Sequence, residues 1–393
     1  MAQLPFQAFD ADQHYYEAED AFIRHIDPRM KKRCMQWATI DGRQRLLVGG
    51  KVNRFIPNPT FDPVAKPGIL DEYFRGKNPE QKDVRTLFGE LDPINPAYRD
   101  RDARLALMDT QGIEGAFFLP TLGVGMEESL RDDLPALLAA FTAFNRWMDE
   151  DWGFAYQNRI FAAPYITLVD EAWATSELQH ALDHDARVIV MRPGPIAHKD
   201  GSCSPGDKRF DRFWGLAAEA GITVSYHSGD AGYLRYSADW GTTEEFKAFE
   251  FDTLRHCLSA SPIRDTLAAL VCHGVLERHP NTRIATIETG SSWVAPLMES
   301  LKKAYGQMPT AFASDPVQQL RDHVWVSPYY EDDLEGLRDR LGADKILFGS
   351  DYPHAEGLAE PTDYIYDLKG YDEDEIRLTM RENGLGLTLR RPA

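Results

Sequence analysis

The sequence predicts an α/β fold, a (β/α)8 or TIM barrel, and two observations along its 393 residues support this. Short, continuously apolar runs alternate with amphipathic helical patterns, and continuous hydrophobicity is typical of parallel strands that are buried on both faces. Eight such runs occur, each separated from the next by a helical pattern. Eight β/α units in one chain favour a closed barrel over an open sheet.

The elements follow one another in a regular order. The predicted strands cover residues 6–12, 114–120, 159–166, 187–192, 222–227, 283–288, 323–327 and 345–349. The helical patterns, with apolar residues three or four positions apart, cover residues 103–111, 135–151, 170–185, 209–220, 264–279, 291–305, 331–341 and 374–391. We therefore expect the whole chain, residues 1–393, to form one barrel.

Two long insertions interrupt this alternation. Residues 15–100, rich in Pro, Gly, Asn and aromatic residues, follow the first strand, and residues 228–262 follow the fifth. Both start at the carboxyl end of a strand, which is the catalytic face of this kind of barrel. We expect the first to serve as a lid or oligomer contact and the second to lie over the active-site face.

Composition and charge exclude several classes of protein. The chain has 43 Lys and Arg against 62 Asp and Glu, and a net charge of −19 disfavours nucleic acid as a partner. No apolar stretch approaches the ~20 residues of a membrane span, and the N-terminus does not resemble a signal peptide. The four cysteines are widely spaced, as is typical of reduced thiols. We expect a cytoplasmic protein that acts on a small-molecule substrate without nucleic acid or membrane partners.

Ionisable side chains stand where several predicted strands end. Asp12 and His14 lie two positions apart, so they share one face of the first strand. His227 ends the fifth strand, Glu288 ends the sixth, and Asp351 follows the eighth. A single Asp or His at a strand end is usually a helix cap or loop anchor. Their common position at one edge of the barrel instead predicts a divalent-metal site, which would lower the pKa of a bound water to about 7.

The remaining histidines are interpreted as structural. Among them, His180 and His184 have the spacing of a zinc-binding pair on a helix, but this helix is predicted to belong to the outer ring. The others in this group are His25, His198, His256, His273, His279 and His323.

Several motifs, spread over most of the chain outside the insertions, resemble the amidohydrolase superfamily. The resemblance is closest to the branch of aminocarboxymuconate-semialdehyde decarboxylase and the γ-resorcylate and 5-carboxyvanillate decarboxylases. The motifs are Asp12-Gln13-His14, Asn145-Arg146-Trp147, Arg192-Pro193-Gly194-Pro195, His227, GVLERHP at 274–280, Glu288-Thr289-Gly290 and Gly349-Ser350-Asp351-Tyr352-Pro353-His354. The last of these is the most specific.

This resemblance implies one divalent metal at the barrel mouth. Asp12 and His14 match the first-strand ligands, His227 the fifth-strand ligand, and Asp351 the eighth-strand aspartate, which the resemblance also makes the general base. Asp12 stands where His or Glu is usual, which shifts the preference from Zn²⁺ alone towards Mn²⁺ or Fe²⁺ as well. Glu288 stands where many relatives have His, and it is predicted either as a ligand or as a proton shuttle.

Further residues are predicted to support the metal or to contact substrate. The fourth strand lacks the Lys that bridges two metals in binuclear relatives, and Arg192 at its end is expected either to bind substrate or to stabilise a loop. His354 is a candidate catalytic acid. The other candidate substrate contacts are Ser228, Trp240, Trp293 and Tyr329. Family analogy also implies a homo-oligomer, with residues 15–100 as a candidate interface.

Three functions remain open at this point. The first is a mononuclear metal-dependent hydrolase of a small, cyclic or aromatic organic molecule, in which Asp351 is the general base and Glu288 or His354 protonates the leaving group. The alternative is a non-oxidative, metal-dependent decarboxylase of an aromatic or unsaturated acid, as in the relatives named above. We lean towards hydrolysis because the usual sixth-strand His is absent. The third, a non-catalytic barrel used as a scaffold, predicts that no metal is bound.

Overall fold

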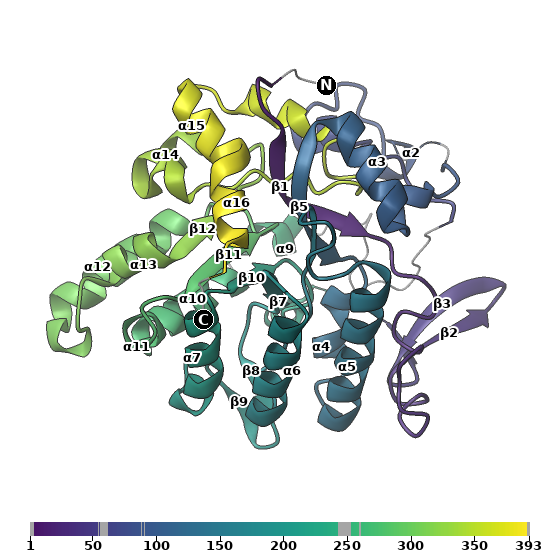
Figure 1. The fold of residues 1–393 in the computed structure, drawn as a ribbon, viewed down its shortest axis with the longest axis horizontal. Coiled ribbons are helices and arrows are strands. Elements are labelled where there is room, and N and C mark those ends of the chain that lie inside the picture. The colour runs from purple at the N-terminus through teal and green to yellow at the C-terminus, as the bar shows by residue number, and fades with distance from the viewer. Residues whose placement is uncertain are drawn as a thin grey trace.

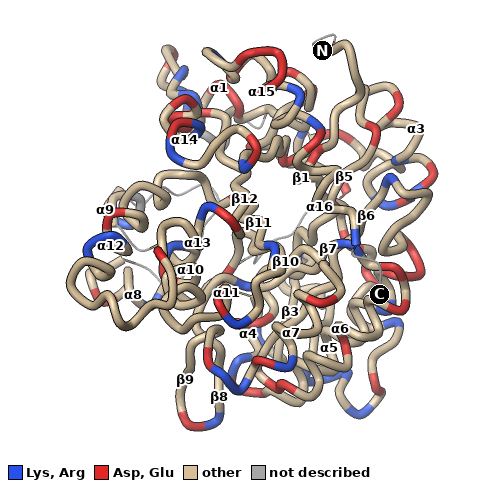
Figure 2. The backbone as a smooth tube through the Cα atoms, turned by 60° about the vertical axis from the view of Figure 1, so that its left-hand side comes forward, with Lys and Arg blue, Asp and Glu red and all other residues tan. Residues whose placement is uncertain are grey.

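Seven parallel strands form most of a barrel wall in the computed structural model, which describes residues 4–53, 55, 62–87, 89, 91–242, 253–258 and 261–390. Two sheets, β1-β5-β6 and β7-β10-β11-β12, are parallel throughout. A bridge between Tyr165 and Val190 joins them on one side. In Figure 2 these strands are arranged around a common centre, with the helices outside. Their bounds are β1 Ala8–Tyr15, β5 Ile113–Pro120, β6 Ile160–Ala162, β7 Val188–Met191, β10 Thr223–His227, β11 Arg283–Ile287 and β12 Val324–Val326.

The eighth wall segment closes the ring without being a regular strand. The strand expected at 345–349 is present only as a bridge between Ile346 and Val326. The backbone N–H of Leu347 donates to Val326, and that of Ala11 donates to Phe348, so the segment still joins β12 to β1. The N–H of Phe348 donates instead to the carbonyl of Thr379. The predicted barrel is therefore confirmed, and the prediction of a regular eighth strand is wrong because the C-terminal region takes one of its hydrogen bonds.

The helices surround this wall, and several begin at predicted positions because an aspartate caps them. The side chains of Asp100, Asp133 and Asp170 each accept a backbone N–H from the first turn of α3, α5 and α6. The longer outer helices are α3 Arg101–Gln111, α5 Leu134–Asp151, α6 Glu171–Asp183, α7 Asp211–Ala220, α10 Pro262–Cys272, α12 Val294–Gln307, α13 Pro316–His323 and α14 Leu334–Leu341. Within the described residues, none of the helices has the length and apolarity needed to cross a bilayer.

Two predicted helices are divided. The pattern at 264–279 forms α10 and then α11 (Val275–Arg278), because Gly274 adopts a left-handed conformation with φ of 70° between them. The pattern at 374–391 forms α15 (Glu373–Arg377), a π-helical turn (Leu378–Glu382) and α16 (Asn383–Thr388). This C-terminal region packs beside β1, so the first wall strand and α16 are neighbours in Figure 1.

The two insertions carry small elements of their own. The first contains the antiparallel strands β2 and β3, which extend away from the barrel in Figure 1. The second is described only in part. The insertions and other loops contain β2 Met35–Ile40, β3 Arg43–Val48, β4 Lys51–Val52, α1 Asp71–Phe74, α2 Val84–Leu87, α4 Met126–Ser129, β8 Ile196–His198, β9 Gly201–Cys203, α8 Leu234–Ala238 and α9 Thr253–Cys257.

The C-terminal helix offers a test of how tightly it packs on the wall. A Cβ at Gly384 would lie 2.3 Å from Cδ1 of Phe9 in β1, whereas a Cβ at Gly386 would meet no atom within 4 Å. We expect Gly384→Ala to lower the free energy of unfolding by about 1–3 kcal/mol through overpacking. Gly386→Ala, two residues away in α16, is the matched control and should raise it by up to about 1 kcal/mol. Chemical denaturation measures both, and equal effects of the two substitutions would contradict this packing.

Candidate metal centre

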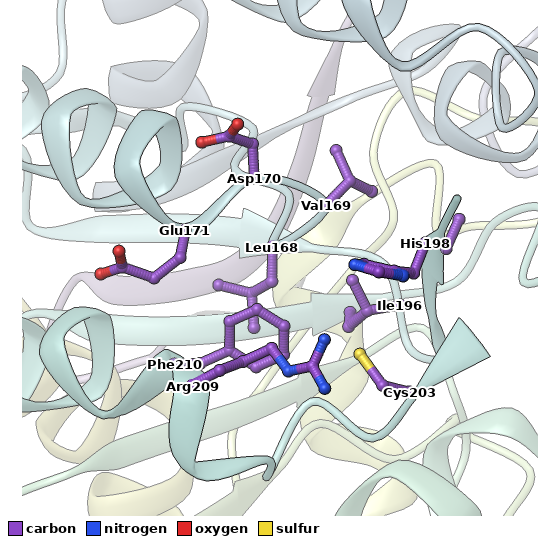
Figure 3. Close-up of a pocket in the computed structure, with 10 residues that line it drawn as sticks. Leu168, Val169, Asp170, Glu171, Ile196, His198, Cys203, Arg209 and Phe210 are labelled. Carbon is purple, nitrogen blue, oxygen red and sulfur yellow. The ribbon is translucent and has the colours of Figure 1, made fainter. Parts of the chain in front are cut away.

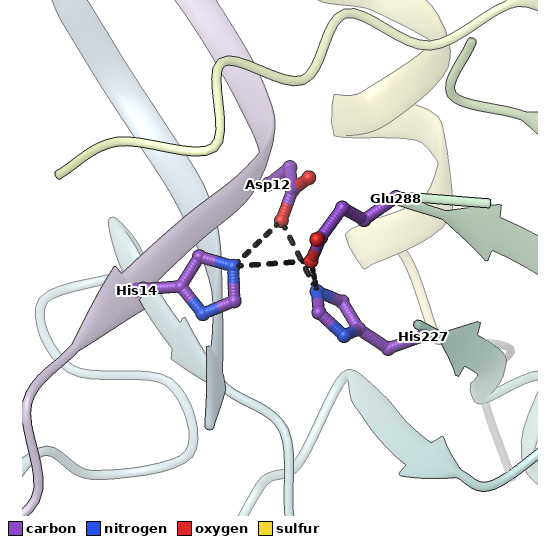
Figure 4. Close-up of side chains that lie close together, drawn as sticks. All are labelled: Asp12, His14, His227 and Glu288. Atoms are coloured by element: carbon purple, nitrogen blue, oxygen red, sulfur yellow. Dashed lines mark ion pairs between the residues drawn. The ribbon is translucent and has the colours of Figure 1, made fainter. Parts of the chain in front are cut away.

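Four side chains from three wall strands meet at the carboxyl end of the barrel (Figure 4). Asp12 and His14 come from β1, His227 is the last residue of β10, and Glu288 follows β11. One candidate ligand atom from each lies within 4.8 Å of the other three. His14 Nε2 is 3.2 Å from Asp12 Oδ1, and His227 Nε2 is 3.0 Å from Glu288 Oε2 and 3.5 Å from Asp12 Oδ1. The structure thus brings together four of the five predicted ligands in one group.

These atoms fit a divalent cation. Ligand atoms placed tetrahedrally at about 2.1 Å from an ion are separated by roughly 3.4 Å, close to the spacings found here. Asp12 Oδ1, His14 Nε2 and His227 Nε2 are buried and have no hydrogen-bond partner. His227 Nδ1 lies 2.7 Å from the carbonyl oxygen of Ser228, which fixes the proton on Nδ1 and leaves the Nε2 lone pair free. An ion would therefore satisfy atoms that are otherwise costly to bury.

The electrostatics of the cluster also favour a cation. Burial lowers the pKa of His227, but the charges of Glu288 and Asp12 outweigh it and raise that pKa to about 9. For His14, burial lowers the pKa, but the nearby carboxylates of Asp12 and Asp351 outweigh it and raise the pKa. Without a metal, the carboxylates thus draw protons onto the imidazoles. A divalent ion competes for the same nitrogen lone pairs.

Asp351, the predicted general base, lies beside this group. Its Oδ1 is 3.2 Å from His14 Nε2 and 2.7 Å from His354 Nδ1. Burial raises the pKa of Asp351, but the charge of His354 and the close contacts with both histidines outweigh it, so the pKa falls below the usual range. Asp351 is therefore a carboxylate at neutral pH. Its role as a fifth ligand remains a prediction.

Thr121, which sequence analysis missed, holds His354 in place. Its hydroxyl donates to the carbonyl of Tyr15 at 2.8 Å and lies 3.0 Å from His354 Nε2. Since a hydroxyl has one hydrogen, its oxygen is left to accept from Nε2–H of His354. Nδ1 lies 2.7 Å from Asp351 Oδ1, so Thr121 and Asp351 hold the ring from its two nitrogens. Thr121 follows β5, at the same barrel edge as the predicted ligands, and this position was the available signal.

A buried carboxylate ties the first and eighth wall segments together directly below the ligands. Asp10 accepts hydrogen bonds from the Ser350 backbone N–H at 3.0 Å, from the Ser350 hydroxyl, and from Gln13 Nε2 at 3.0 Å. Burial outweighs these hydrogen bonds and raises the pKa of Asp10 to about 7. The contacts fix the spacing between β1, which carries two ligands, and the segment that carries Asp351.

A second supporting residue, Arg104 on α3, was also missed. It is fully buried, and burial lowers its pKa to about 10. Its Nη2 donates to the carbonyl of His14 at 2.7 Å, and its guanidinium lies over the rings of Phe118 and Tyr352. The sequence did hold a sign of this role, because Arg104 is a charged residue next to Leu105 on the apolar face of the helix. Arg104 therefore anchors the end of β1 at the backbone of a predicted ligand.

Two site residues adopt a backbone conformation that is uncommon outside glycine. Glu288 has φ of 50° and Asp351 has φ of 56°, both in the left-handed region. Such positions cost of order 1–3 kcal/mol and persist where the surrounding structure determines them. The Tyr329 hydroxyl, for example, donates to the carbonyl of Glu288 at 2.9 Å. Both strained residues, Glu288 and Asp351, direct their side chains towards the cluster from the ends of two wall segments.

The predicted substrate contacts differ in their surroundings. Arg192 is buried, its Nε lies 3.2 Å from Glu127 Oε1, and its Nη1 donates to the carbonyl of Ala231. These contacts favour the loop-stabilising alternative for Arg192. Trp293 is also buried and donates to the carbonyl of Gly290, whereas Trp240 is 60 % exposed. Two of the predicted substrate contacts bond to the four-residue cluster. The hydroxyl of Tyr329 donates to the backbone carbonyl of Glu288, and the backbone carbonyl of Ser228 accepts from His227 Nδ1. Substrate contact remains a prediction for all of them.

A separate cavity of about 240 Å³ lies between the start of α6 and the β8-β9 hairpin (Figure 3). Its lining includes Asp170, His198 and Arg209, and none of the four clustered ligands. This cavity is therefore separate from the candidate metal centre, which is identified by the chemistry of its side chains.

Comparison with known proteins agrees with the geometry. The amidohydrolase family model matches residues 90–384, about three quarters of the chain. The chain belongs to the amidohydrolase family. The match starts near the end of the first insertion, so Asp12 and His14 precede it, while the other clustered ligands and Asp351 lie within it. The amidohydrolase superfamily consists of enzymes, which include hydrolases and decarboxylases, and its members bind divalent metals.

Solved structures extend this assignment. The amidohydrolase map2389c from Mycobacterium avium subsp. paratuberculosis K-10 is 44% identical, covers 98% of both chains and has a TM-score of 0.93. A dihydroxybenzoic acid decarboxylase from Polaromonas sp. JS666, solved with manganese and 2-nitroresorcinol, is 14% identical over 98% of this chain and 97% of that one, with a TM-score of 0.59. 4-Oxalomesaconate hydratase from Rhodopseudomonas palustris is 12% identical over 97% and 95%, with a TM-score of 0.52. The last two likenesses concern the fold alone.

The ligand set is testable by metal analysis of purified protein. We expect His227→Ala and Asp12→Asn each to lose most of the bound divalent metal, because each removes a buried atom that faces the ion. His323→Ala, whose Nδ1 lies 2.8 Å from the carbonyl of Thr282 away from the cluster, is the matched control and should retain it. Full metal occupancy in both ligand variants would contradict the site.

Thr121 provides a test of positioning rather than of ligation. We expect Thr121→Val to retain the metal and to lower kcat by about 10- to 100-fold, because His354 loses the oxygen that orients it. Thr121→Ser keeps the hydroxyl and should restore most of the activity. Steady-state kinetics with metal content measured in parallel separate this from metal loss. Equal kcat values for the valine and serine variants would refute the role.

Proposed function

We propose that this amidohydrolase-family member is a mononuclear metal-dependent hydrolase of a small, uncharged organic molecule, with Asp351 as the general base. The observation that carries the proposal is an ionised Asp351 held between His354 and a ligand histidine. Asp12, His14, His227 and Glu288 would hold the ion, which is Zn²⁺, Mn²⁺ or Fe²⁺ by the mixed nitrogen and oxygen donor set. When bound, such an ion lowers the pKa of a coordinated water to about 7 and polarises the substrate.

The remaining steps fall to side chains of the chain itself. Asp351 accepts the proton from the attacking water, because its carboxylate is ionised and its Oδ1 faces the cluster. Asp351 passes this proton to His354 through their 2.7 Å contact, and His354 gives a proton to the leaving group, so that the proton taken from water ends on the product. Glu288 is the alternative acid, since its side chain is partly exposed towards the mouth. Thr121 keeps His354 oriented through this cycle.

The charge around the mouth supports an uncharged substrate. Glu288, Asp351 and Glu356 each offer a carboxylate oxygen within 4.8 Å of one another, and Asp12 lies next to them. A substrate carboxylate would approach these groups against their repulsion. Arg192, the buried cation after β7, is already paired with Glu127 and Glu128. This arrangement favours hydrolysis of a neutral molecule over binding of an aromatic acid.

Aromatic side chains beside the cluster support a flat or cyclic substrate. The ring of Tyr16 lies 5.8 Å from that of His354, centroid to centroid, and Tyr329 is 40 % exposed next to Glu288. A flat, partly exposed ring such as that of Tyr329 favours contact with planar ligands. The occurrence of dihydroxybenzoate decarboxylases among the structural neighbours makes decarboxylation the competing reaction to test.

Isotope labelling separates the two reactions. The metal-loaded protein is incubated in ¹⁸O-water with neutral cyclic amides and lactones, and separately with 2,6-dihydroxybenzoate. We expect ¹⁸O in the product of a neutral substrate and no CO₂ from the acid. Release of CO₂ from the acid without ¹⁸O incorporation from any neutral probe would overturn the proposal.

Substitution of the base tests the role of Asp351 on whichever neutral substrate is turned over. We expect Asp351→Asn to lower kcat by roughly 10²–10⁴-fold, because the amide accepts no proton. Asp363→Asn, on the turn that follows the eighth wall segment, is the control and should leave kcat unchanged. Metal content is measured in each variant, and wild-type kcat in metal-loaded Asp351→Asn would exclude Asp351 as the base.

A further inference from the structure

A second group of metal-ligating side chains lies between two outer helices. Asp149 is in the last turn of α5, His180 is in the last turn of α6, and His184 caps the end of α6. One ring nitrogen of each histidine and one carboxylate oxygen of Asp149 all lie within 4.8 Å of one another. None of these residues belongs to the cluster at the barrel mouth. Sequence analysis interpreted both histidines as structural.

The side chains are already arranged around a common point. His184 Nδ1 is paired with Asp149 Oδ2 in a short contact. The rings of the two histidines, one helical turn apart, have centroids 4.0 Å from each other. His180 Nε2 is buried and has no hydrogen-bond partner. Two imidazoles and a carboxylate thus converge, and one nitrogen remains unsatisfied.

The local charge allows a cation to enter. Arg146, the nearby basic side chain on α5, donates to both oxygens of Glu177 at 2.7 and 3.2 Å, so the two charges offset each other. Asp149 then leaves the group with negative charge.

An ion pair alone explains only part of this arrangement. A protonated His184 next to Asp149 at the carboxyl end of a helix is favourable by itself. It does not account for His180, whose ring lies against that of His184 and whose Nε2 is left without a partner. Leaving a buried polar atom unpaired is unfavourable, and a metal ion would remove that cost.

We propose that Asp149, His180 and His184 bind a zinc ion that links α5 to α6 on the outside of the barrel. Two imidazoles and one carboxylate, with ligands four residues apart on a helix, form a donor set that suits Zn²⁺. The side chain of His184 is 43% exposed, so a water molecule completes the coordination. Because α5 supplies one ligand and α6 two, the ion would restrain these helices relative to each other.

The experiment measures zinc in a protein whose barrel site has been removed. In the His227→Ala background we expect isothermal titration with ZnCl₂ to give one site per chain. Adding His180→Gln and His184→Gln should abolish that site, and adding His198→Gln instead should leave it intact. His198 is the matched control, because it also lies near an aspartate, Asp200, at 3.9 Å, but without a third ligand among the metal-ligating groups of the described residues.

Two further measurements distinguish zinc bound between α5 and α6 from zinc bound at the barrel mouth. In the wild-type protein, we expect two zinc ions per chain, and one in the His180→Gln, His184→Gln double variant. Zinc should also raise the Tm of the His227→Ala protein and leave that of the triple variant unchanged. Zinc binding that survives in the triple variant, or its absence from the His227→Ala protein, would overturn the proposal without affecting the function proposed for the barrel mouth.

Discussion

Charge compensation is the constraint on which the catalytic end of this barrel depends. Asp12, Glu288 and Asp351 are brought within reach of two imidazoles in a largely buried space. Burying like charges this closely is unfavourable unless a cation or protons offset them, and the raised pKa values of His14 and His227 express that demand. Keeping these charges together therefore lowers the free energy of unfolding, and it gives the mouth of the barrel a candidate cation site.

The spacing of the site comes from contacts below it. Asp10 links β1 to Ser350, and Arg104 holds the carbonyl of His14, so the backbone on either side of the cluster is fixed by buried polar groups. Thr121 then places His354 against Asp351. Side chains from separate parts of the chain are thus positioned by a network whose members do not themselves face the metal. Such support keeps ligand geometry precise to a fraction of an ångström.

The alternation of apolar runs and helical patterns was sufficient to predict the barrel, because hydrophobic burial determines both periodicities. The clustering of the candidate ligands could be predicted from strand ends, since parallel strands place them at one edge. The eighth strand was predicted as regular because its sequence, KILFG, is apolar, and its sequence does not reveal that Phe348 bonds to Thr379. Thr121 and Arg104 were missed for a related reason: their roles depend on partners more than 80 residues away in the sequence.

The hydrogen bond from Phe348 to Thr379 couples the eighth wall segment to the C-terminal helical region. It runs from the wall segment that precedes Asp351 to the π-helical turn near the end of the sequence. Loosening that turn would release the backbone segment that leads to Asp351, the proposed base. Residues of the C-terminal helical region thus help to fix the backbone that precedes the proposed base, and a substitution there would act on the barrel mouth from a distance.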